Sequence, residues 1–233
     1  MRRHILSDLR RDAGIGAERL SDSMAGRVIA IDGPAASGKS SVSRGVANDL
    51  GWLFVSSGHF YRAIAWGILR DQVGTESTAS WVAGRKLSLL KETGGISLLL
   101  DGENATPHLT KAEVASKVSV IAAVPDVRDF INARLRALAV DHDLVMEGRD
   151  IGSVVFPESP WKFYLDASPE ERARRRTREG AVDSVTERDR LDSTRSTAPL
   201  TIAPGATVID TTHLNLQQVI AAVLSHLSGL KDS

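Results

Sequence analysis

Residues 28–40 read VIAIDGPAASGKS. The opening apolar run predicts a buried strand, and the residues after it fit the pattern G-x-x-x-x-G-K-[ST]. Gly33 and Gly38 allow backbone N–H groups to turn inward without a Cβ in the way, so that they can surround polyphosphate oxygens at the start of the next helix. We expect Lys39 to reach the β- and γ-phosphates of a nucleotide and the Ser40 hydroxyl to hold Mg²⁺.

The residues after this loop favour a binding site over a glycine-rich turn that binds nothing. Apolar residues recur at helical spacing through 42–50, and Gly51 ends the predicted helix. The loop therefore joins a strand to a helix, as phosphate binding requires. The expected contacts with ATP are Gly33, Pro34, Ala35, Ala36, Ser37, Gly38, Lys39, Ser40 and Ser41.

The composition limits the classes of protein to which this chain can belong. Its 233 residues suffice for one domain with insertions, and a net charge of zero gives no reason to expect nucleic acid or an anionic membrane as a partner. The chain has no cysteine, which excludes disulfides and thiol catalysis, and its six histidines have no metal-like spacing. The apolar runs are far shorter than the ~20 residues of a membrane helix. We therefore expect a cytoplasmic protein that does not span a membrane.

Residues 1–26 are polar and charged, and their acidic residues argue against a transit peptide. Because the first core strand begins near Val28, we expect this segment to be a mobile appendage, and Met24 is a candidate for the natural start. Residues 27–233 are then expected to form a single domain.

Predicted strands and helices alternate along the rest of the chain. Apolar runs predict strands at 52–55, 144–146, 161–165 and 207–210, and helical periodicity predicts helices at 59–69, at 126–140 and from about 216. The run 96–100, followed by Asp101-Gly102, predicts a small β element with a tight turn. This alternation predicts a parallel α/β sheet, in which ligands lie at the carboxyl ends of the strands.

Two polar clusters follow predicted strands. Ser57 and Arg62 come after the second strand, where an arginine suits a second phosphate group, although a helix-start serine beside a surface arginine is the alternative. The cluster 147–150, Glu-Gly-Arg-Asp, follows three apolar residues. Such charges cost free energy in a core, so they indicate either a site or a structural ion pair.

Residues 168–171, Ser-Pro-Glu-Glu, are typical of the start of a helix, and Arg172, Arg175 and Arg176 follow on one face of it. This face is a solvated surface, a nucleic-acid patch, or a lid that supplies cations to a transferred phosphoryl group. The polar segment 177–184, which contains a glycine, would let such a lid move.

Arg188, Asp192 and Arg195 are spaced four and three residues apart and share a further helical face. They form either an ion-paired surface stripe or a site in which Asp192 accepts hydrogen bonds from ribose hydroxyls.

These motifs together resemble the bacterial-type cytidylate kinases, from about Val28 to Val219 and in the order of that family. Ser56 stands where the family often has an aspartate, and Thr110 where it often has an arginine. The resemblance rests on Ile31-Asp32-Gly33-Pro34, Ser57-Gly58 with Tyr61-Arg62, Thr110 to Arg128, Gly148-Arg149-Asp150-Ile151-Gly152, Val155-Phe156-Pro157, Ala167 to Ala173, Arg188-Asp189 with Asp192 and Arg195, and Ala198-Pro199-Leu200.

The resemblance implies the three-layer α/β fold of P-loop nucleoside triphosphatases, built on a parallel sheet. It implies a nucleoside monophosphate-binding region inserted at about 59–143 and a short arginine-rich lid at about 172–184. It also implies transfer of the γ-phosphoryl group of ATP, with Mg²⁺, to CMP or dCMP in pyrimidine nucleotide metabolism. From these features we expect a monomer that binds neither nucleic acid nor a membrane.

The resemblance further implies a role for each matched residue. Lys39 and the lid arginines Arg172, Arg175 and Arg176 would stabilise the transferred phosphoryl group. Arg62 and Arg149 would hold the acceptor phosphate, and Ser57 would also contact the acceptor. Ser119, Arg128 and Asp150 would face the edge of cytosine, while Arg188 and Asp192 would hold the sugar with Arg195 nearby.

The residues taken without the resemblance leave other functions open. A phosphate-loop kinase acting on another small molecule would share the same donor site. A GTP switch lacks support because no Asn-Lys-x-Asp motif is present. RNA binding rests only on the arginines at 172–178, and the zero net charge and the lack of interleaved aromatic residues weaken it.

Overall fold

The computed structural model describes residues 26–92, 95–178 and 200–227. They form two compact units. The sheet unit consists of residues 26–58 and those from 135 onward, and the inserted unit consists of residues 59–134. The expected appendage at 1–26 lies outside the described residues except for Gly26.

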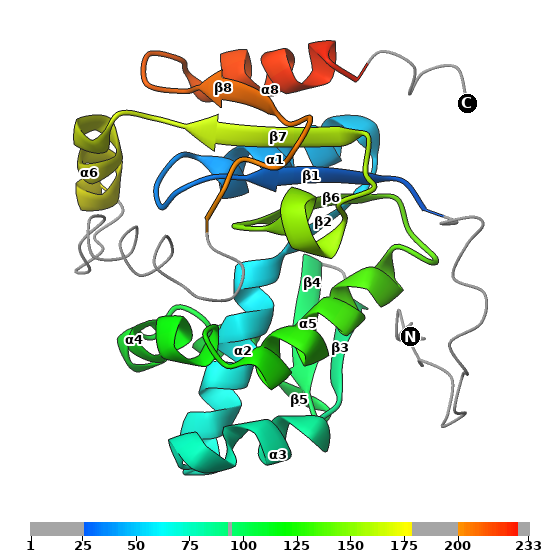
Figure 1. Ribbon diagram of the computed structural model, residues 1–233, viewed down its shortest axis with the longest axis vertical. Coiled ribbons are helices and arrows are strands. Elements are labelled where there is room, and N and C mark those ends of the chain that lie inside the picture. The colour runs from blue at the N-terminus through cyan, green and yellow to red at the C-terminus, as the bar shows by residue number, and fades with distance from the viewer. Residues whose placement is uncertain (1–25, 93–94, 179–199, 228–233) are drawn as a thin grey trace. The chain divides into compact units, whose positions relative to one another are not determined.

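The sheet unit is built on five parallel strands: β1 (Val28–Asp32), β2 (Leu53–Ser56), β6 (Leu144–Gly148), β7 (Trp161–Asp166) and β8 (Thr207–Asp210). Their order is β2-β6-β1-β7-β8, so that β1 lies at the centre between β6 and β7 (Figure 1). Every residue of β1 is buried, which explains its unbroken apolar run up to Asp32. The prediction of a parallel α/β sheet is confirmed, and the carboxyl ends of the strands meet at one edge.

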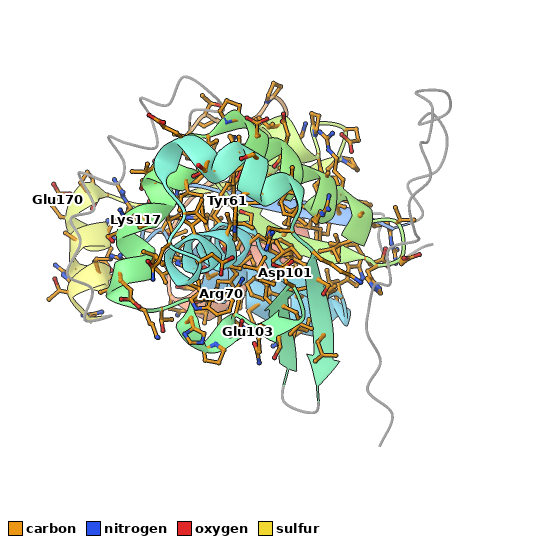
Figure 2. All side chains as sticks on the ribbon, turned by 90° about the horizontal axis from the view of Figure 1, so that it is seen from below. Tyr61, Arg70, Asp101, Glu103, Lys117 and Glu170 are labelled. Atoms are coloured by element: carbon orange, nitrogen blue, oxygen red, sulfur yellow. The ribbon has the colours of Figure 1, made fainter. Side chains whose placement is uncertain are left out.

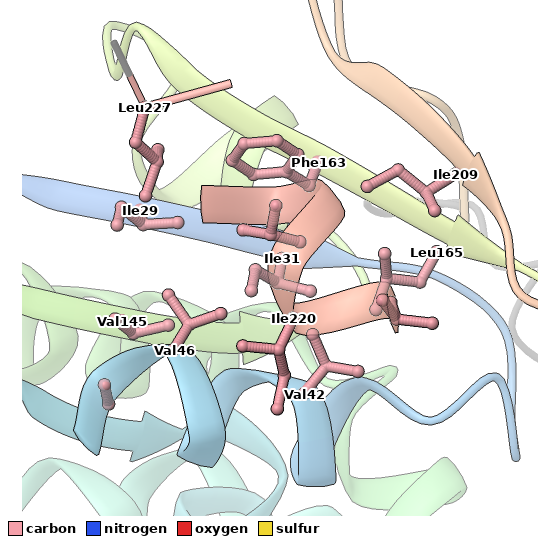
Figure 3. Close-up of a cluster of buried hydrophobic side chains, with 13 residues drawn as sticks. Ile29, Ile31, Val42, Val46, Val145, Phe163, Leu165, Ile209, Ile220 and Leu227 are labelled. Carbon is pink, nitrogen blue, oxygen red and sulfur yellow. The ribbon is translucent and has the colours of Figure 1, made fainter. Parts of the chain in front are cut away.

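Two helices cover one face of this sheet, namely α1 (Lys39–Leu50) and α8 (Leu216–Ser225). Figure 3 shows Val42 and Val46 of α1 and Ile220 of α8 lying against Ile29 and Ile31 of β1. Burial of each such side chain stabilises the fold by about 1.5–3 kcal/mol. The apolar residues predicted on α1 therefore hold this helix against the sheet, and the helix begins at the phosphate-binding loop.

The remaining elements of the sheet unit lie near the carboxyl ends of its strands. A π-helical turn, η3 (Ile151–Val155), follows β6, and α6 (Pro169–Arg178) follows β7. Helix α6 begins as its sequence predicts, since the Glu171 N–H donates to Ser168 Oγ over 3.2 Å.

The inserted unit combines helices with a small antiparallel sheet of order β3-β4-β5. The predicted tight turn is confirmed, because Leu100 pairs with Glu103 and the two residues between them both have positive φ. The elements are α2 (Ser57–Arg70), which begins two residues before this unit, η1 (Thr75–Ser77), α3 (Thr78–Ala83), β3 (Leu87–Glu92), β4 (Gly95–Leu100), β5 (Glu103–Asn104), η2 (Thr106–His108), α4 (Ala112–Ile121) and α5 (Pro125–Leu138), which ends in the sheet unit.

A network of charges ties the turn of this small sheet to the end of α2. Arg70 donates to Asp71 and to Glu103 over 2.7 Å each and lies 3.8 Å from Asp101 (Figure 2). Its guanidinium also lies 4.9 Å from the ring centre of Trp66. The turn is therefore held by side chains as well as by its own backbone.

Among the helices of the described residues, none is both long and apolar enough to cross a membrane.

Gly67 of α2 provides a test of how tightly the inserted unit is built. An ideal Cβ on Gly67 would lie 2.3 Å from Leu100 Cδ2 and 2.7 Å from Trp81 Cη2. We expect Gly67→Ala to lower the free energy of unfolding by about 1–2 kcal/mol, because overpacking outweighs the gain in helix propensity. Gly74→Ala is the matched control, since nothing lies within 4 Å of its Cβ position. Urea unfolding would measure both, and equal stability of the two variants would contradict this contact.

Candidate active site

The predicted phosphate-binding loop joins the end of β1 to the first turn of α1. An ideal Cβ on Gly33 would lie 2.1 Å from the carbonyl oxygen of Leu165, so only glycine fits where the loop leaves the sheet. Ala36 and Gly38 have φ values of 59° and 91°, and such left-handed residues create the backbone concavities that bind anions. Ser37, fully buried, donates from its hydroxyl to the Pro34 carbonyl over 3.1 Å. The loop is thus held in shape by its own residues.

Lys39 lies over this loop. Its ammonium donates to the carbonyl oxygen of Pro34 over 2.5 Å and to Ser37 Oγ over 3.4 Å, and the side chain is buried. The next two residues of α1, Ser40 and Ser41, are exposed. A cation and a hydroxyl therefore lie at the start of the helix, where the sequence predicts the phosphates and Mg²⁺.

The end of β1 is also tied to the cluster that follows β6. The Asp32 carboxylate accepts the N–H of Ile151 over 2.8 Å and that of Gly152 over 2.7 Å. Arg149 Nη1 donates to the carbonyl oxygen of Gly33 over 2.9 Å. The predicted donor loop and the predicted acceptor residues Arg149 and Asp150 are consequently brought together in the sheet unit.

Asp32 is almost completely buried, and this burial raises the pKa of its carboxyl to about 7. The N–H groups of Gly152 and Ile151 lower the pKa, the Asp150 carboxylate raises it, and the Lys39 ammonium lowers it. Asp32 belongs to a motif that the chain shares with the cytidylate kinases, but the sequence does not predict what its carboxyl group contacts. Its partners come from a segment 119 residues later in the chain, which no local pattern indicates.

A second acidic residue at this edge is Glu147, the residue before Gly148 in β6. Its carboxylate accepts a hydrogen bond from the Ser56 hydroxyl at the end of β2, and both residues are buried. Ser57, the next residue, is also buried and lies beside β6, because an ideal Cβ on Gly148 would be 2.6 Å from Ser57 Oγ. The predicted site residue Ser57 is thus at the same edge as Arg149.

Two of the three predicted lid arginines of α6 contact the phosphate-binding loop or the segment after β8. Arg172, which is buried, donates to the carbonyl oxygens of Ala167 over 3.1 Å and Ala35 over 3.3 Å. Arg175 Nη2 and Nη1 donate to the carbonyl oxygen and hydroxyl of Thr211 over 2.6 and 3.0 Å. Arg175 Nη1 also lies 3.7 Å from the Cβ position of Gly38. Arg176 is half-buried on the same helix.

Thr211 is a residue of this region that the sequence did not reveal. Its buried hydroxyl donates to the carbonyl oxygens of Asp166 over 2.9 Å and Ser37 over 3.2 Å. The only signal in the sequence is its place after the last predicted strand, where parallel sheets bind ligands.

The inserted unit carries the other predicted acceptor residues. Arg128 in α5 is buried, donates to the carbonyl oxygen of Ala122 over 3.2 Å and lies 5.7 Å from the ring centre of Tyr61. Ser119 is half-buried in α4, three residues before Ala122, and Arg62 is half-buried in α2. Arg188, Asp192, Arg195 and the lid residues 179–184 lie outside the described residues.

A phosphate-binding loop at the carboxyl edge of a parallel sheet, with a lysine and three arginines against it, defines a P-loop nucleotide-binding protein of the kinase type. The comparisons with known proteins narrow this class. The sequence model of the cytidylate kinase family matches residues 29–228, which is most of the chain. The chain therefore belongs to the cytidylate kinase family, and the resemblance predicted from its motifs is confirmed.

Individual relatives agree with this assignment. The cytidylate kinase of Thermus thermophilus is 44% identical over 209 residues, which cover 86% of this chain and 98% of that protein. The cytidylate kinase of Caldanaerobacter subterraneus subsp. tengcongensis is 40% identical over 207 residues, covering 84% and 92%. That of Klebsiella pneumoniae is 38% identical over 213 residues, covering 85% and 94%.

The raised pKa of Asp32 predicts a pH dependence of stability. The folded protein retains this proton up to about pH 7, whereas an unfolded chain releases it near pH 4, at about its unperturbed pKa. The stabilisation by the proton is therefore full below about pH 4 and is lost as the pH rises to about 7. Asp32→Asn removes the titrating group, so the stability of the wild type relative to this variant should fall across that range and then become constant. Urea unfolding across the range would measure it, and a constant difference would contradict the assignment.

Proposed function

We propose that this protein transfers the γ-phosphoryl group of ATP to CMP or dCMP, giving ADP and CDP or dCDP. Membership of the cytidylate kinase family over residues 29–228 supports this reaction. The observation in the structure that carries it is the junction at the carboxyl ends of β1 and β6. There Arg149, a predicted contact of the acceptor phosphate, donates directly to the backbone of the donor loop.

On the donor side, the loop from Gly33 to Ser41 would surround the β- and γ-phosphates with its backbone N–H groups. Lys39 would exchange the carbonyl oxygen of Pro34 for phosphate oxygens, a small movement because its ammonium already lies over the loop. Arg172, Arg175 and Arg176 would compensate the negative charge of the transferred group, which is the main requirement of phosphoryl transfer.

Mg²⁺ is the metal ion that fits this site. Ser40 offers an exposed hydroxyl oxygen at the start of α1, and Mg²⁺ prefers oxygen ligands from one or two side chains together with substrate phosphates and water. When bound, the ion would neutralise charge on the triphosphate.

On the acceptor side, the attacking atom is a phosphate oxygen that is already anionic near neutral pH. The reaction therefore needs no general base, and catalysis depends on positioning and charge. Arg62 and Arg149 would hold the acceptor phosphate near Ser57, while Arg188, Asp192 and Arg195 would bind the sugar side of the acceptor.

For base recognition we propose Ser119, Arg128 and Asp150. Cytosine has an amino group at N4 and acceptors at N3 and O2, which a carboxylate, a guanidinium and a hydroxyl complement. Arg128 and Asp150 are both buried, so a base of different pattern would leave polar groups unpaired at roughly 1–3 kcal/mol each.

We also propose that the protein acts in the cytoplasm as a monomer. The lack of cysteine in its sequence is compatible with a reducing compartment. Its substrates, ATP and CMP, are small molecules, and the zero net charge supports neither nucleic acid nor an anionic membrane surface as a partner.

Lys39→Ala tests the donor site. We expect kcat with CMP to fall by about a hundredfold or more with the fold intact, because the substitution removes a cation that acts most strongly as charge shifts during transfer. A coupled assay of ADP release would measure kcat, and circular dichroism would verify the fold. Lys111→Ala, an exposed lysine of the inserted unit, is the control. Retention of most of the wild-type kcat by Lys39→Ala would refute the donor assignment.

A panel of acceptors tests the proposed reaction and its base specificity. With ATP and Mg²⁺, CMP and dCMP should be good acceptors, and UMP should have a kcat/KM at least about tenfold lower, equivalent to about 1.4 kcal/mol. Arg128→Met should lower kcat/KM with CMP, and the ratio of kcat/KM with CMP to kcat/KM with UMP should become smaller. Equal use of UMP or AMP by the wild type would refute the roles of Ser119, Arg128 and Asp150, while the kinase assignment would stand.

A further inference from the structure

The turn η3, which follows Arg149 and Asp150, is wider than a turn of α-helix. The Val155 N–H donates to the Asp150 carbonyl over 3.2 Å, and the Phe156 N–H donates to the Ile151 carbonyl over 2.7 Å, in each case five residues back. Such turns are rare and are found frequently at functional sites. Ile151, Val155 and Phe156 are buried, so this turn is anchored in the core.

Asp32 holds the amino end of this turn. Each of its two carboxylate oxygens accepts one hydrogen bond, from the N–H groups of Ile151 and Gly152. A helical turn leaves its first N–H groups without internal acceptors, so Asp32 satisfies groups that would otherwise be unpaired in a buried position. The bonds place the residues just before them, Arg149 and Asp150, against the end of β1.

Arg136 holds the carboxyl end of the same turn. This residue lies in the last turn of α5, and its Nη2 and Nε atoms donate to the carbonyl oxygens of Val154 and Val155 over 2.8 Å each. The planar guanidinium matches two adjacent carbonyl groups, which a lysine ammonium would not do equally well. Both ends of η3 are therefore fixed by ionisable side chains from other elements.

A carboxylate at the buried amino end of η3 costs free energy, because it is removed from water. Desolvation of Asp32 raises its pKa to about 7, so the folded protein holds a carboxyl group whose ionised form is disfavoured by its surroundings. Groups with such shifted pKa values are found preferentially at functional sites.

We propose that Asp32 and Arg136 are positioning residues for the acceptor nucleotide: by holding η3 at its two ends, they set the placement of Arg149 and Asp150. This inference rests on the proposed function, since it takes Arg149 and Asp150 as contacts of CMP. It adds a role for two side chains that need not touch either nucleotide.

The test is steady-state kinetics of the full chain with ATP and Mg²⁺, varying CMP and ATP in turn. Arg136→Met should raise KM for CMP about tenfold, as loss of a supporting contact does, with less than about a twofold change in KM for ATP. Arg136→Lys should give an intermediate KM for CMP, because lysine retains donors without the planar fork. If Arg136→Met does not fold, Arg136→Lys provides the test. A raised KM for CMP with an unchanged KM for ATP in this variant would support the proposal, and equal changes in the two KM values would overturn it.

Asp32→Asn should also raise KM for CMP, since an amide offers one acceptor oxygen in place of two. Because both residues hold the same turn, the double variant Asp32→Asn, Arg136→Met should lose less kcat/KM for CMP than the product of the two single losses. Multiplicative losses would show that the residues act separately and would overturn the proposal.

Arg27→Met is the matched control. Arg27 Nε and Nη2 donate to the Asp143 carboxylate over 3.2 and 2.7 Å, and this residue precedes β1 at the opposite end of the strand. The control therefore loses comparable hydrogen bonds in the same unit, and its KM for CMP should equal that of the wild type. If Arg136→Met behaves like Arg27→Met, or raises both KM values equally, the proposal is wrong. A wild type that does not phosphorylate CMP would instead refute the proposed function, and this inference with it.

Discussion

The carboxylate of Asp32 joins the last residue of the central strand to the turn that follows its neighbour β6, through two amide hydrogen bonds inside the protein. Gly33 leaves the sheet from the same point, and its carbonyl oxygen accepts from Arg149. The phosphate-binding loop and the predicted acceptor residues that follow β6 thus share one buried junction. A shift of either segment would leave amide groups or a carboxylate unpaired in a dry environment, which costs several kcal/mol. Their mutual geometry is consequently set before any substrate binds.

The arginines of α6 give the same loop a second support. Arg172 holds the carbonyl of Ala35, and Arg175 reaches Thr211, whose hydroxyl donates to the carbonyl of Ser37. The first turns of α6 are therefore fixed to the loop and to the segment after β8. The arginines of this helix would therefore already be in place beside the loop if they act on a transferred phosphoryl group.

Local features were predictable from the sequence because neighbouring residues alone determine them. The apolar run of β1, the glycines of the loop, the Ser168 cap and the Asp101-Gly102 turn are of this kind, and each is present. Helices α3 and α4 and strand β3 were not predicted, since their short mixed segments acquire regular structure by burying single faces, as Val82, Leu87 and Val114 do. The links made by Asp32, Thr211 and Arg136 depend on how separate segments pack against one another in the fold, and so no local pattern contains them.

The strand order also governs when the donor loop can take shape. Both neighbours of β1 in the sheet come more than a hundred residues later in the chain. The inserted unit, residues 59–134, is a continuous stretch that lies in the sequence between β1 and β6. During synthesis, β1 therefore has no strand to pair with until β6 and then β7 have been made. Closing so long a loop costs less entropy once the inserted unit is compact, which favours folding of that unit first. The nucleotide site would then be among the last parts of a newly made chain to form, and a ribosome-bound chain that stops before β7 would carry the complete loop sequence without the ability to hold ATP.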